Sequence, residues 1–320
     1  MLRLRETLSF VSRSRHYAER FRDTEISSET PLKTLQTLPF TYPAELRTEP
    51  LAFLCVPLSE AERIVTLPTS GTTGTPKRVY FSAAELGATE HFFRFGMRSI
   101  ARHGGRTMVF MRGGAPDGFA VPGGVCDLLS QAQSSIGCTS IAYGELGDDA
   151  QVEAASVALR TSNADCVVGT AAQMQRLAHL GPQPSVRSVL LSADDTPREV
   201  LAELAKAWRC RVFRHYGMTE TAFGGAVDCR PVFDGSDEAD CVEGECGMHI
   251  REPDMIFEVV DPATGEQMPD GEPGELVLTT LTRRVMPLVR YRTGDISRII
   301  PGKCPCGCVL RRLDYVTGHA

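Results

Sequence analysis

The first two thirds of the chain alternate short apolar runs with segments whose apolar residues recur at helical spacing. The apolar runs are predicted strands and cover residues 107–111, 140–143, 166–169, 186–192 and 211–216. The predicted helices cover residues 126–136, 152–159 and 171–180 and a Leu201-rich segment that begins near Pro197. Strands and helices that alternate in this way pack as layers. The sequence therefore predicts an α/β fold around a largely parallel sheet.

The pattern changes after about residue 225. Apolar runs at 255–260, 274–279 and 296–300 are short and are separated by turns rich in glycine and proline, which is typical of β-structure. We therefore divide the chain into an α/β part, residues 1–225, and a smaller β-rich subdomain, residues 226–320. A chain of 320 residues is long enough to bury a large core.

A nine-residue loop between the predicted strands 64–68 and 78–82 reads Thr69-Ser70-Gly71-Thr72-Thr73-Gly74-Thr75-Pro76-Lys77. Its glycines allow a tight turn and a close approach to a ligand. Its backbone N–H groups and hydroxyls can surround phosphate oxygens, and Lys77 adds a charge that phosphate attracts. Because the P-loop spacing is absent, we predict a different kind of phosphate-binding loop. The alternative is a Gly/Thr turn without function.

Two later segments strengthen this interpretation, His215-Tyr216-Gly217-Met218-Thr219-Glu220 and Tyr291-Arg292-Thr293-Gly294-Asp295. In content and order, the three motifs resemble those of the acyl- and aryl-adenylate-forming superfamily, which includes acyl-CoA synthetases, luciferases and peptide-synthetase adenylation domains. The surrounding residues 274–282 and 286–295 are most similar to the phenylacetate-CoA ligase branch. The resemblance spans nearly the whole chain and implies a layered α/β adenylation core.

The resemblance implies an ATP-dependent ligase that activates an aryl or acyl carboxylic acid as its acyl-adenylate, releases pyrophosphate and allows transfer to CoA. It implies catalytic roles for Lys77, Thr219 and Glu220, with Glu220 as the Mg²⁺ ligand, the kind of hard oxygen that magnesium prefers. The implied ATP/AMP-binding residues are Thr69, Ser70, Gly71, Thr72, Thr73, Gly74, Lys77, Ala193, Asp194, His215, Tyr216, Gly217, Thr219 and Asp295.

Several of these roles have simpler alternatives. Asp295 follows Thr293-Gly294 and could be an ordinary turn aspartate, and Asp194 could cap the next helix. The acid pocket is expected near the glycine-rich residues 113–118 and 121–124, with Phe119 and residues 223–225 as an apolar wall. Phenylalanines in such positions are equally typical of a core.

The chain has eleven cysteines, six of them toward its C-terminal end. Cys304-Pro305-Cys306-Gly307-Cys308 is a compact thiol turn, and thiolate and imidazole are the ligands of structural zinc. The C-x-C spacing by itself is weak evidence for a zinc site. Some phenylacetate-CoA ligase relatives carry a similar arrangement, and this resemblance implies that Cys229, His249, Cys304 and Cys306 bind zinc. The additional thiols Cys241, Cys246 and Cys308 leave the ligand set open, and reduced thiols without metal are the alternative.

Composition and charge exclude some classes of protein. The net charge of −6 argues against a general nucleic-acid binder, and no apolar run has membrane-spanning length. The opening residues 1–10 are predicted as a surface helix rather than a transit peptide, because Glu6 is unusual in such a peptide. We expect a cytoplasmic protein, and a homodimer is compatible with these features.

In the family, the core is normally followed by a small C-terminal domain that carries a catalytic lysine. This sequence ends at Thr317-Gly318-His319-Ala320, where the family usually has Gly-Arg and a hinge. The resemblance therefore implies a core without this lid domain, whose activity would depend on a partner protein that supplies it. The alternative is a non-catalytic nucleotide-binding or scaffold protein. A redox or metal-handling protein that uses the cysteine cluster is a weaker third hypothesis.

Overall fold

The computed structural model describes residues 2–22, 24, 30–67, 77–192, 196–233 and 247–320. Several predicted residues lie outside these ranges: Thr69, Ser70, Gly71, Thr72, Thr73, Gly74, Ala193, Asp194, Cys241 and Cys246. Lys77 is the first described residue after the predicted phosphate loop. Among the described residues, no helix combines the length and the apolar character needed to cross a membrane.

The helices are α1 (Leu2–Phe10), α2 (Arg15–Arg20), α3 (Pro31–Thr37), α4 (Pro43–Thr48), α5 (Ala83–Ile100), α6 (Val125–Ser134), α7 (Asp149–Ser162), α8 (Ala171–His179) and α9 (Arg198–Trp208). The strands are β1 (Arg63–Leu67), β2 (Lys77–Phe81), β3 (Arg106–Val109), β4 (Thr139–Ala142), β5 (Cys166–Gly169), β6 (Ser188–Ser192), β7 (Arg211–Tyr216), β8 (Ala226–Asp228), β9 (Met248–Ile250), β10 (Met255–Val260), β11 (Gly274–Thr280), β12 (Tyr291–Ser297), β13 (Ile299–Ile300), β14 (Arg312–Leu313) and β15 (Gly318–His319).

The larger sheet has nine strands in the order β13-β14-β9-β8-β7-β6-β5-β3-β4. The strands from β7 to β4 are parallel, as the alternating pattern predicts. From β7 to β13 the neighbouring strands are antiparallel. The sheet is therefore parallel in one half only, and its antiparallel half comes from residues beyond 225. The proposed division of the chain at residue 225 remains a prediction.

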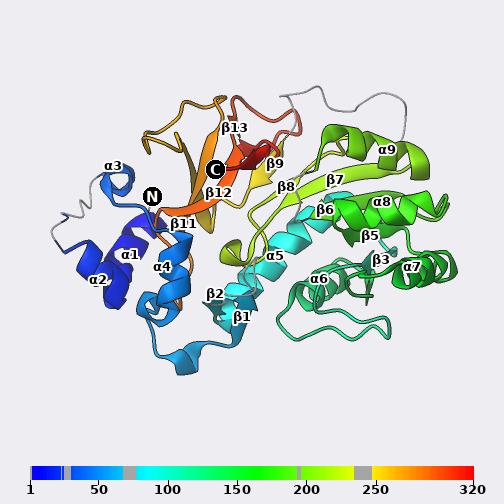
Figure 1. The fold of residues 1–320 in the computed structure, drawn as a ribbon, viewed down its shortest axis with the longest axis horizontal. Helices are drawn as coiled ribbons and strands as arrows, with labels where there is room; N and C mark the ends of the chain where they lie inside the picture. Colours follow the sequence, from blue (N-terminus) through cyan, green and yellow to red (C-terminus); the bar gives the residue numbers. More distant parts are fainter. Residues whose placement is uncertain (1, 23, 25–29, 68–76, 193–195, 234–246) are drawn as a thin grey trace.

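Helices cover both faces of the parallel half (Figure 1). One apolar cluster joins α7, α8 and α9 to the sheet and includes Leu159, Met174 and Trp208. The other joins α5 and α6 to the opposite face and includes Met97 and Leu129. Because apolar residues line both faces, these strands read as continuous apolar runs in the sequence.

A smaller antiparallel sheet, in the order β10-β11-β12-β15, lies beside the N-terminal helices (Figure 1). Leu4 and Leu8 of α1 are buried, as expected for a surface helix that packs along one side. The predicted strand 296–300 is wrong as a single element. The chain leaves the small sheet at Ser297 and enters the large sheet at Ile299, and Arg298 between them pairs with Asp314 at 2.9 Å.

Helix α5 begins with a capping box. The Ser82 side chain accepts a hydrogen bond from the Glu85 backbone N–H, and the Glu85 carboxylate accepts one from the Ser82 N–H at 2.8 Å. Two orphan N–H groups of the first turn are satisfied in this way. The same carboxylate also accepts hydrogen bonds from the backbone N–H groups of Arg284 and Val285. Glu85 therefore fixes the start of α5 to the segment that follows the small sheet's β11.

Candidate functional site

The motif around residue 216 lies where β7 ends. Tyr216 is the last residue of β7, and its hydroxyl donates a 2.6 Å hydrogen bond to Oδ2 of Asp295 on β12. A Cβ atom at Gly217 would lie 2.3 Å from the carbonyl oxygen of Phe223 and 2.5 Å from Cε1 of His215. Only glycine fits this approach, so the sequence Tyr216-Gly217 allows the chain to turn back tightly beside the strand.

Glu220 lies in a short 3₁₀ turn, Thr219–Thr221, and its side chain is 1% exposed. The turn is stabilised by Thr221, whose hydroxyl donates to the carbonyl oxygen of Met218 at 2.8 Å. Lys77 forms a close ion pair with Glu220, and the Tyr291 hydroxyl donates to Oε1 of Glu220 at 2.8 Å. The structure thus joins residues 77, 220 and 291 in one buried group of lysine, carboxylate and phenol.

Asp295 pairs with two polar side chains. Besides the Tyr216 hydroxyl, Nδ1 of His319 lies 3.0 Å from Oδ1 of Asp295. Burial raises the pKa of the Asp295 carboxyl, although the Tyr216 hydrogen bond and His319 oppose the shift. Burial and the nearby Asp295 charge also raise the pKa of Tyr216, so its hydroxyl stays protonated and remains a donor.

Two clefts meet at the 217–218 segment. The first, which we name the Asp295 cleft, contains about 950 Å³ of space including its open mouth and is lined by His215, Tyr216, Asp295 and His319 among others. The second, the Phe223 cleft, contains about 910 Å³ on the same measure, and its lining includes Thr219 and Phe223. Gly217 and Met218 line both clefts, so a bound molecule could extend from one into the other.

A smaller, almost wholly apolar cavity lies next to both clefts. This His215 cavity contains about 380 Å³ of space on the same measure, which includes its open mouth, and is lined by Phe92, Phe93, Met97, Leu129, Ser192 and His215 among others. It shares Ser192 with the Phe223 cleft and His215 with the Asp295 cleft. Ligand pockets of this kind are typically concave, mostly apolar and equipped with few polar groups.

The sequence indicated some of these residues and missed others. Gly113, Gly124 and Phe223 do line the Phe223 cleft, whereas Phe119 is 59% exposed and forms no part of its described wall. Sequence reasoning missed Phe92 and Phe93, because nothing in a helical pattern says which side chains face a cavity. It also missed the contact of Tyr291 with Glu220, although Tyr291 belongs to a motif that was recognised.

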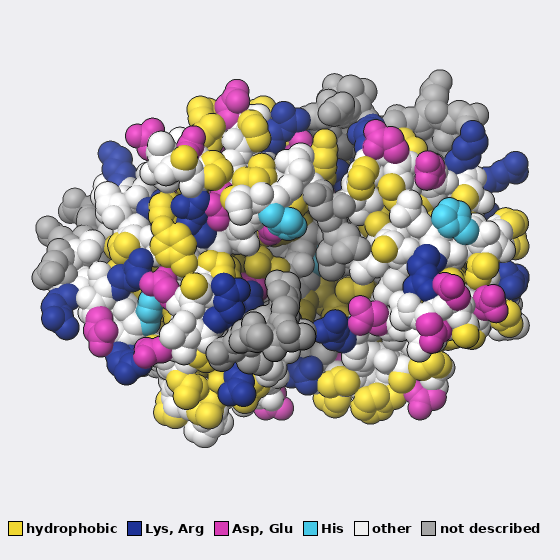
Figure 2. All heavy atoms as spheres, in the orientation of Figure 1, with side chains coloured by type: hydrophobic (Ala, Val, Ile, Leu, Met, Phe, Trp, Pro, Cys, Tyr) yellow, Lys and Arg dark blue, Asp and Glu magenta, His cyan; other side chains and the backbone are white. Residues whose placement is uncertain are grey.

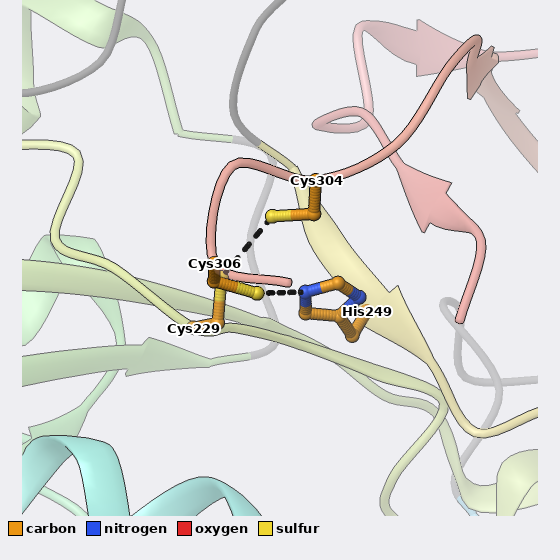
Figure 3. Close-up of side chains that lie close together, drawn as sticks. All are labelled: Cys229, His249, Cys304 and Cys306. Carbon is orange, nitrogen blue, oxygen red and sulfur yellow. Dashed lines mark hydrogen bonds between the residues drawn. The ribbon is translucent and has the colours of Figure 1, made fainter. Parts of the chain in front are cut away.

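The predicted zinc ligands form a second site. Cys229 follows β8, His249 lies on β9, and Cys304 and Cys306 lie on the loop after β13. Figure 3 shows the four side chains pointing toward one another, and their ligand atoms all lie within 4.8 Å of one another. Sγ of Cys229 is 3.6 Å from Sγ of Cys304, and Nε2 of His249 is 3.2 Å from Sγ of Cys306.

The two sulfur atoms are as far apart as in a tetrahedral zinc site, and the N–S distance of 3.2 Å is slightly shorter. Zinc bonds of ordinary length imply S–S and S–N edges of about 3.5–3.8 Å. Nδ1 of His249 lies 3.2 Å from the carbonyl oxygen of Leu310, an interaction that orients the ring and leaves Nε2 to face the thiols. Burial, together with the neighbouring thiols Cys306 and Cys304, raises the pKa of Cys229. A cation bound between the thiols would oppose this shift and favour the thiolate form of Cys229.

Comparison with known proteins identifies the family of the chain. A model of the family described as AMP-binding enzyme matches residues 15–282. The phenylacetate-coenzyme A ligase of Thermus thermophilus is 28% identical over 296 residues, which are 90% of this chain and 61% of that protein. The phenylacetate-coenzyme A ligase of Aromatoleum evansii is 28% identical over 95% of this chain and 66% of that protein. This chain thus spans less than two thirds of the length of either relative.

Solved structures show the same fold. A 2-hydroxyisobutyryl-CoA ligase in complex with 2-HIB-AMP and CoA matches with a TM-score of 0.80 at 19% identity, covering 99% of this chain and 66% of that chain. An ATP-bound RpMatB-BxBclM chimera matches with a TM-score of 0.52 at 18% identity, covering 79% of this chain and 47% of that chain. At such identities the likeness establishes the fold alone, and the predicted layered α/β core is confirmed.

Proposed function

This chain belongs to the AMP-binding enzyme family, and on that premise we propose that it activates a carboxylic acid as an acyl-adenylate, with ATP as co-substrate and pyrophosphate as product. The observation that carries the proposal is the side-chain contact between three separate motifs, two of which line the adjoining clefts. Glu220 is paired with Lys77 and Tyr291, while Tyr216 is bonded to Asp295. Lys77 and Asp295, 218 positions apart in the sequence, are thereby each paired with a side chain of the middle motif.

The residues of the Asp295 cleft suit a nucleoside. We assign the ribose hydroxyls to Asp295, an acceptor held in place by the Tyr216 hydroxyl at 2.6 Å. The adenine ring lies against Tyr216 in this proposal, with His215 and Gly217 beside it. We assign the phosphates to the predicted loop residues 69–74 and the adenine also to Ala193 and Asp194. These residues lie outside the described parts of the chain.

The phosphate end of the nucleotide is assigned to Lys77, Thr219 and Glu220. In the proposed reaction a carboxylate oxygen of the acid attacks the α-phosphorus, the new P–O bond forms, and the bond to the β-phosphate bridge breaks to release pyrophosphate. Such transfer depends on positioning and charge stabilisation. Lys77 then interacts with phosphate oxygens in place of Glu220, and Glu220 becomes available as an oxygen ligand for Mg²⁺.

The acid is assigned to the His215 cavity. Its walls are apolar, and it borders the Phe223 cleft where Thr219 lies, so an acid bound with its apolar part inside can present its carboxylate toward the nucleotide. CoA is the proposed acceptor of the activated acyl group, by analogy with the named relatives.

Acid-dependent exchange of labelled pyrophosphate into ATP tests the proposal. The assay would compare the unmodified protein with Lys77→Ala and Glu220→Ala across a panel of aryl and acyl carboxylates. We expect exchange with one class of acid, and a loss of at least about a hundredfold in each variant, because charged transition-state contacts are worth several kcal/mol. Glu153→Gln on the exposed side of α7 is the matched control. ATP binding without exchange would instead favour a non-catalytic nucleotide-binding protein.

We propose zinc as a structural ion at Cys229, His249, Cys304 and Cys306. The donor set, three thiols and one imidazole, is one that structural zinc uses. Bound zinc would connect β8, β9 and the loop after β13. Metal analysis of the purified protein should find about one zinc per chain, and Cys304→Ser should lower both zinc content and thermal stability. Cys308→Ser should change neither, since Cys308 lies outside the group. A metal-free, equally stable protein would contradict the assignment.

The remaining partner and location assignments are proposals as well. We propose a cytoplasmic location, because the nine described cysteines are free thiols, which a reducing compartment preserves. On the visible face, basic and acidic side chains of the described residues are interspersed (Figure 2), which supports the proposal that nucleic acid is not a partner. A homodimer is tested by light scattering, and a partner that supplies a lid by pyrophosphate exchange that appears only when that partner is added.

A further inference from the structure

His215, which lines the His215 cavity, has a ring nitrogen that the proposed reaction does not use. The imidazole of His215 packs against the rings of Phe92 and Phe93, each with its centroid 6.0 Å from the imidazole centroid. Its Nδ1 lies 3.0 Å from Oγ of Ser192. Its Nε2 is fully buried and has no hydrogen-bond partner among the described residues. Buried polar atoms are nearly always paired, so an unpaired one in a cavity calls for a physical explanation.

The imidazole is neutral under ordinary conditions. Burial lowers the pKa of His215 to about 4, so the ring carries no charge at neutral pH. In a neutral imidazole, one nitrogen donates and the other accepts a hydrogen bond. The Ser192 hydroxyl can pair with Nδ1 in either tautomer, which leaves Nε2 as a donor in one case and an acceptor in the other.

We propose that the cavity selects an aromatic acid that bears a hydroxyl group, and that Nε2 of His215 is the hydrogen-bond partner of this hydroxyl. This inference rests on the proposed function. A hydroxyl both donates and accepts, so it matches either tautomer of the ring. The two phenylalanine rings suit an aromatic body, because aromatic rings prefer edge-to-face and offset contacts with one another.

Other occupants fit less well. An ionised group would lose its hydration against the apolar side chains that form nearly the whole wall, and no charged side chain among the named lining residues would offset that loss. A water molecule needs two to four polar partners, and the two polar side chains in the described lining, Ser192 and His215, already pair with each other through Nδ1, which leaves Nε2 as the one unpaired side-chain atom for a water. A wholly apolar ligand would fit the walls and leave Nε2 unpaired.

Stable analogues of the acyl-adenylate test the inference by direct binding. The probes are phenylacetyl sulfamoyl adenosine and its three ring-hydroxylated isomers, with sulfamoyl adenosine alone as the reference for nucleotide binding. Calorimetry would give the dissociation constant of each. We expect the best hydroxylated isomer to bind roughly 10–100 times more tightly than the unsubstituted probe, the range that pairing a buried polar group provides.

Two variants of matched length isolate the hydrogen bond. His215→Met removes the polar atom, and His215→Gln retains an amide near the position of Nε2. The hydroxyl preference is the dissociation constant of the unsubstituted probe divided by that of the hydroxylated probe. Any effect of the substitution on nucleotide binding is common to both probes and cancels in this ratio. It should fall to about one in His215→Met and persist in His215→Gln.

The outcomes distinguish a failure of the proposed function from a failure of the role given to His215. If sulfamoyl adenosine itself does not bind, the proposed function fails and this inference fails with it. If it binds and the hydroxylated and unsubstituted probes bind equally, the proposed function stands and the role of His215 is overturned. A hydroxyl preference that survives in His215→Met also overturns that role, because another group must then recognise the hydroxyl.

Discussion

At Glu220, a carboxylate that is almost completely buried is balanced by the protein's own lysine. Removing one partner of a buried ion pair leaves an uncompensated charge, which is strongly destabilising. Lys77→Met should therefore lower the free energy of unfolding by about 3 kcal/mol. Urea denaturation of the ligand-free protein measures this change.

A double variant separates charge from packing. In Lys77→Met combined with Glu220→Gln, no buried charge remains, so much of the lost stability should return. Tyr291 can still donate to the amide oxygen at this position. Stability losses that simply add in the double variant would show that the ion pair is not the cause.

The buried Asp295 carboxyl predicts a pH dependence of nucleotide binding. Burial raises its pKa above the ordinary value of 3.8, so the carboxylate gains a proton at a higher pH than an exposed aspartate does. If the ionised form binds the ribose, AMP affinity should fall as the pH decreases from neutral through this raised pKa. Titrations of AMP at several pH values test the expectation.

Variants assign the titration to one group. Asp295→Asn should weaken AMP binding by roughly tenfold or more, because hydrogen bonds to charged groups are worth about 1.5–3 kcal/mol. It should also abolish the pH-dependent step. His319→Gln should keep the step, and its disappearance there would transfer the effect from Asp295 to His319.

The sequence indicated the motif residues but not how they pair. Glu220, Tyr216 and Asp295 stand in short motifs whose order is informative. The structure joins Tyr216 and Asp295 in one cleft, and Glu220 follows Thr219, which lines the adjoining cleft. Their roles in binding and catalysis remain predictions. The pairings of Tyr216 with Asp295 and of Tyr291 with Glu220 depend on how the two sheets face each other, which local patterns do not encode.

Among the elements, α5 shows how one side chain can connect distant segments. The Glu85 carboxylate accepts hydrogen bonds from three backbone N–H groups, those of Ser82, Arg284 and Val285. Glu85→Gln replaces one accepting oxygen with a donor, so at least one buried N–H loses its partner. We expect the free energy of unfolding to fall by about 1–3 kcal/mol. Urea denaturation measures the loss.

The matched control is Glu153→Gln on α7, where the side chain is exposed. Substitutions at such positions usually change stability by less than about 0.5 kcal/mol. Equal effects of the two variants would show that the loss at Glu85 reflects charge alone and not its three hydrogen bonds.

Elements with a strong local pattern were the most predictable. Residues 166–169, 211–216 and 255–260 are strands with the predicted bounds, because continuous apolar runs are typical of strands buried on both faces. The prediction of a single strand at residues 296–300 was wrong, because an apolar run does not show that the chain changes sheets at Arg298. The antiparallel half of the large sheet was missed for a similar reason, since strands as short as β8, β9 and β14 carry little pattern.

On the scale of the whole molecule, the first fifty residues and the small sheet are interdependent. The Val289 backbone N–H donates to the Tyr17 hydroxyl at 2.9 Å, and the Thr41 hydroxyl donates to the Val289 carbonyl at 2.7 Å. Arg290 donates to the carbonyl oxygens of Gln36 and Leu38. The N-terminal helices are therefore attached to a segment that lies near the other end of the chain.

Tyr17→Phe tests this attachment, because it leaves the buried Val289 N–H without its acceptor. Thermal and urea unfolding should show a loss of about 1–3 kcal/mol. The control Tyr80→Phe removes the hydroxyl of another buried tyrosine, one that makes no hydrogen bond to a described residue, and should have a smaller effect. A similar loss in both variants would contradict the role given to the Tyr17 hydroxyl.

The bond between Tyr17 and Val289 also has a consequence for biosynthesis. The two residues are 272 positions apart, so at about 5–20 residues per second Tyr17 is made roughly 15–55 s before its partner. For that time the nascent chain carries Leu4, Leu8, Tyr17 and Phe53, all buried in the finished protein, without the sheet that covers them. We therefore expect a chaperone that binds apolar segments to bind this N-terminal region while the chain is still on the ribosome.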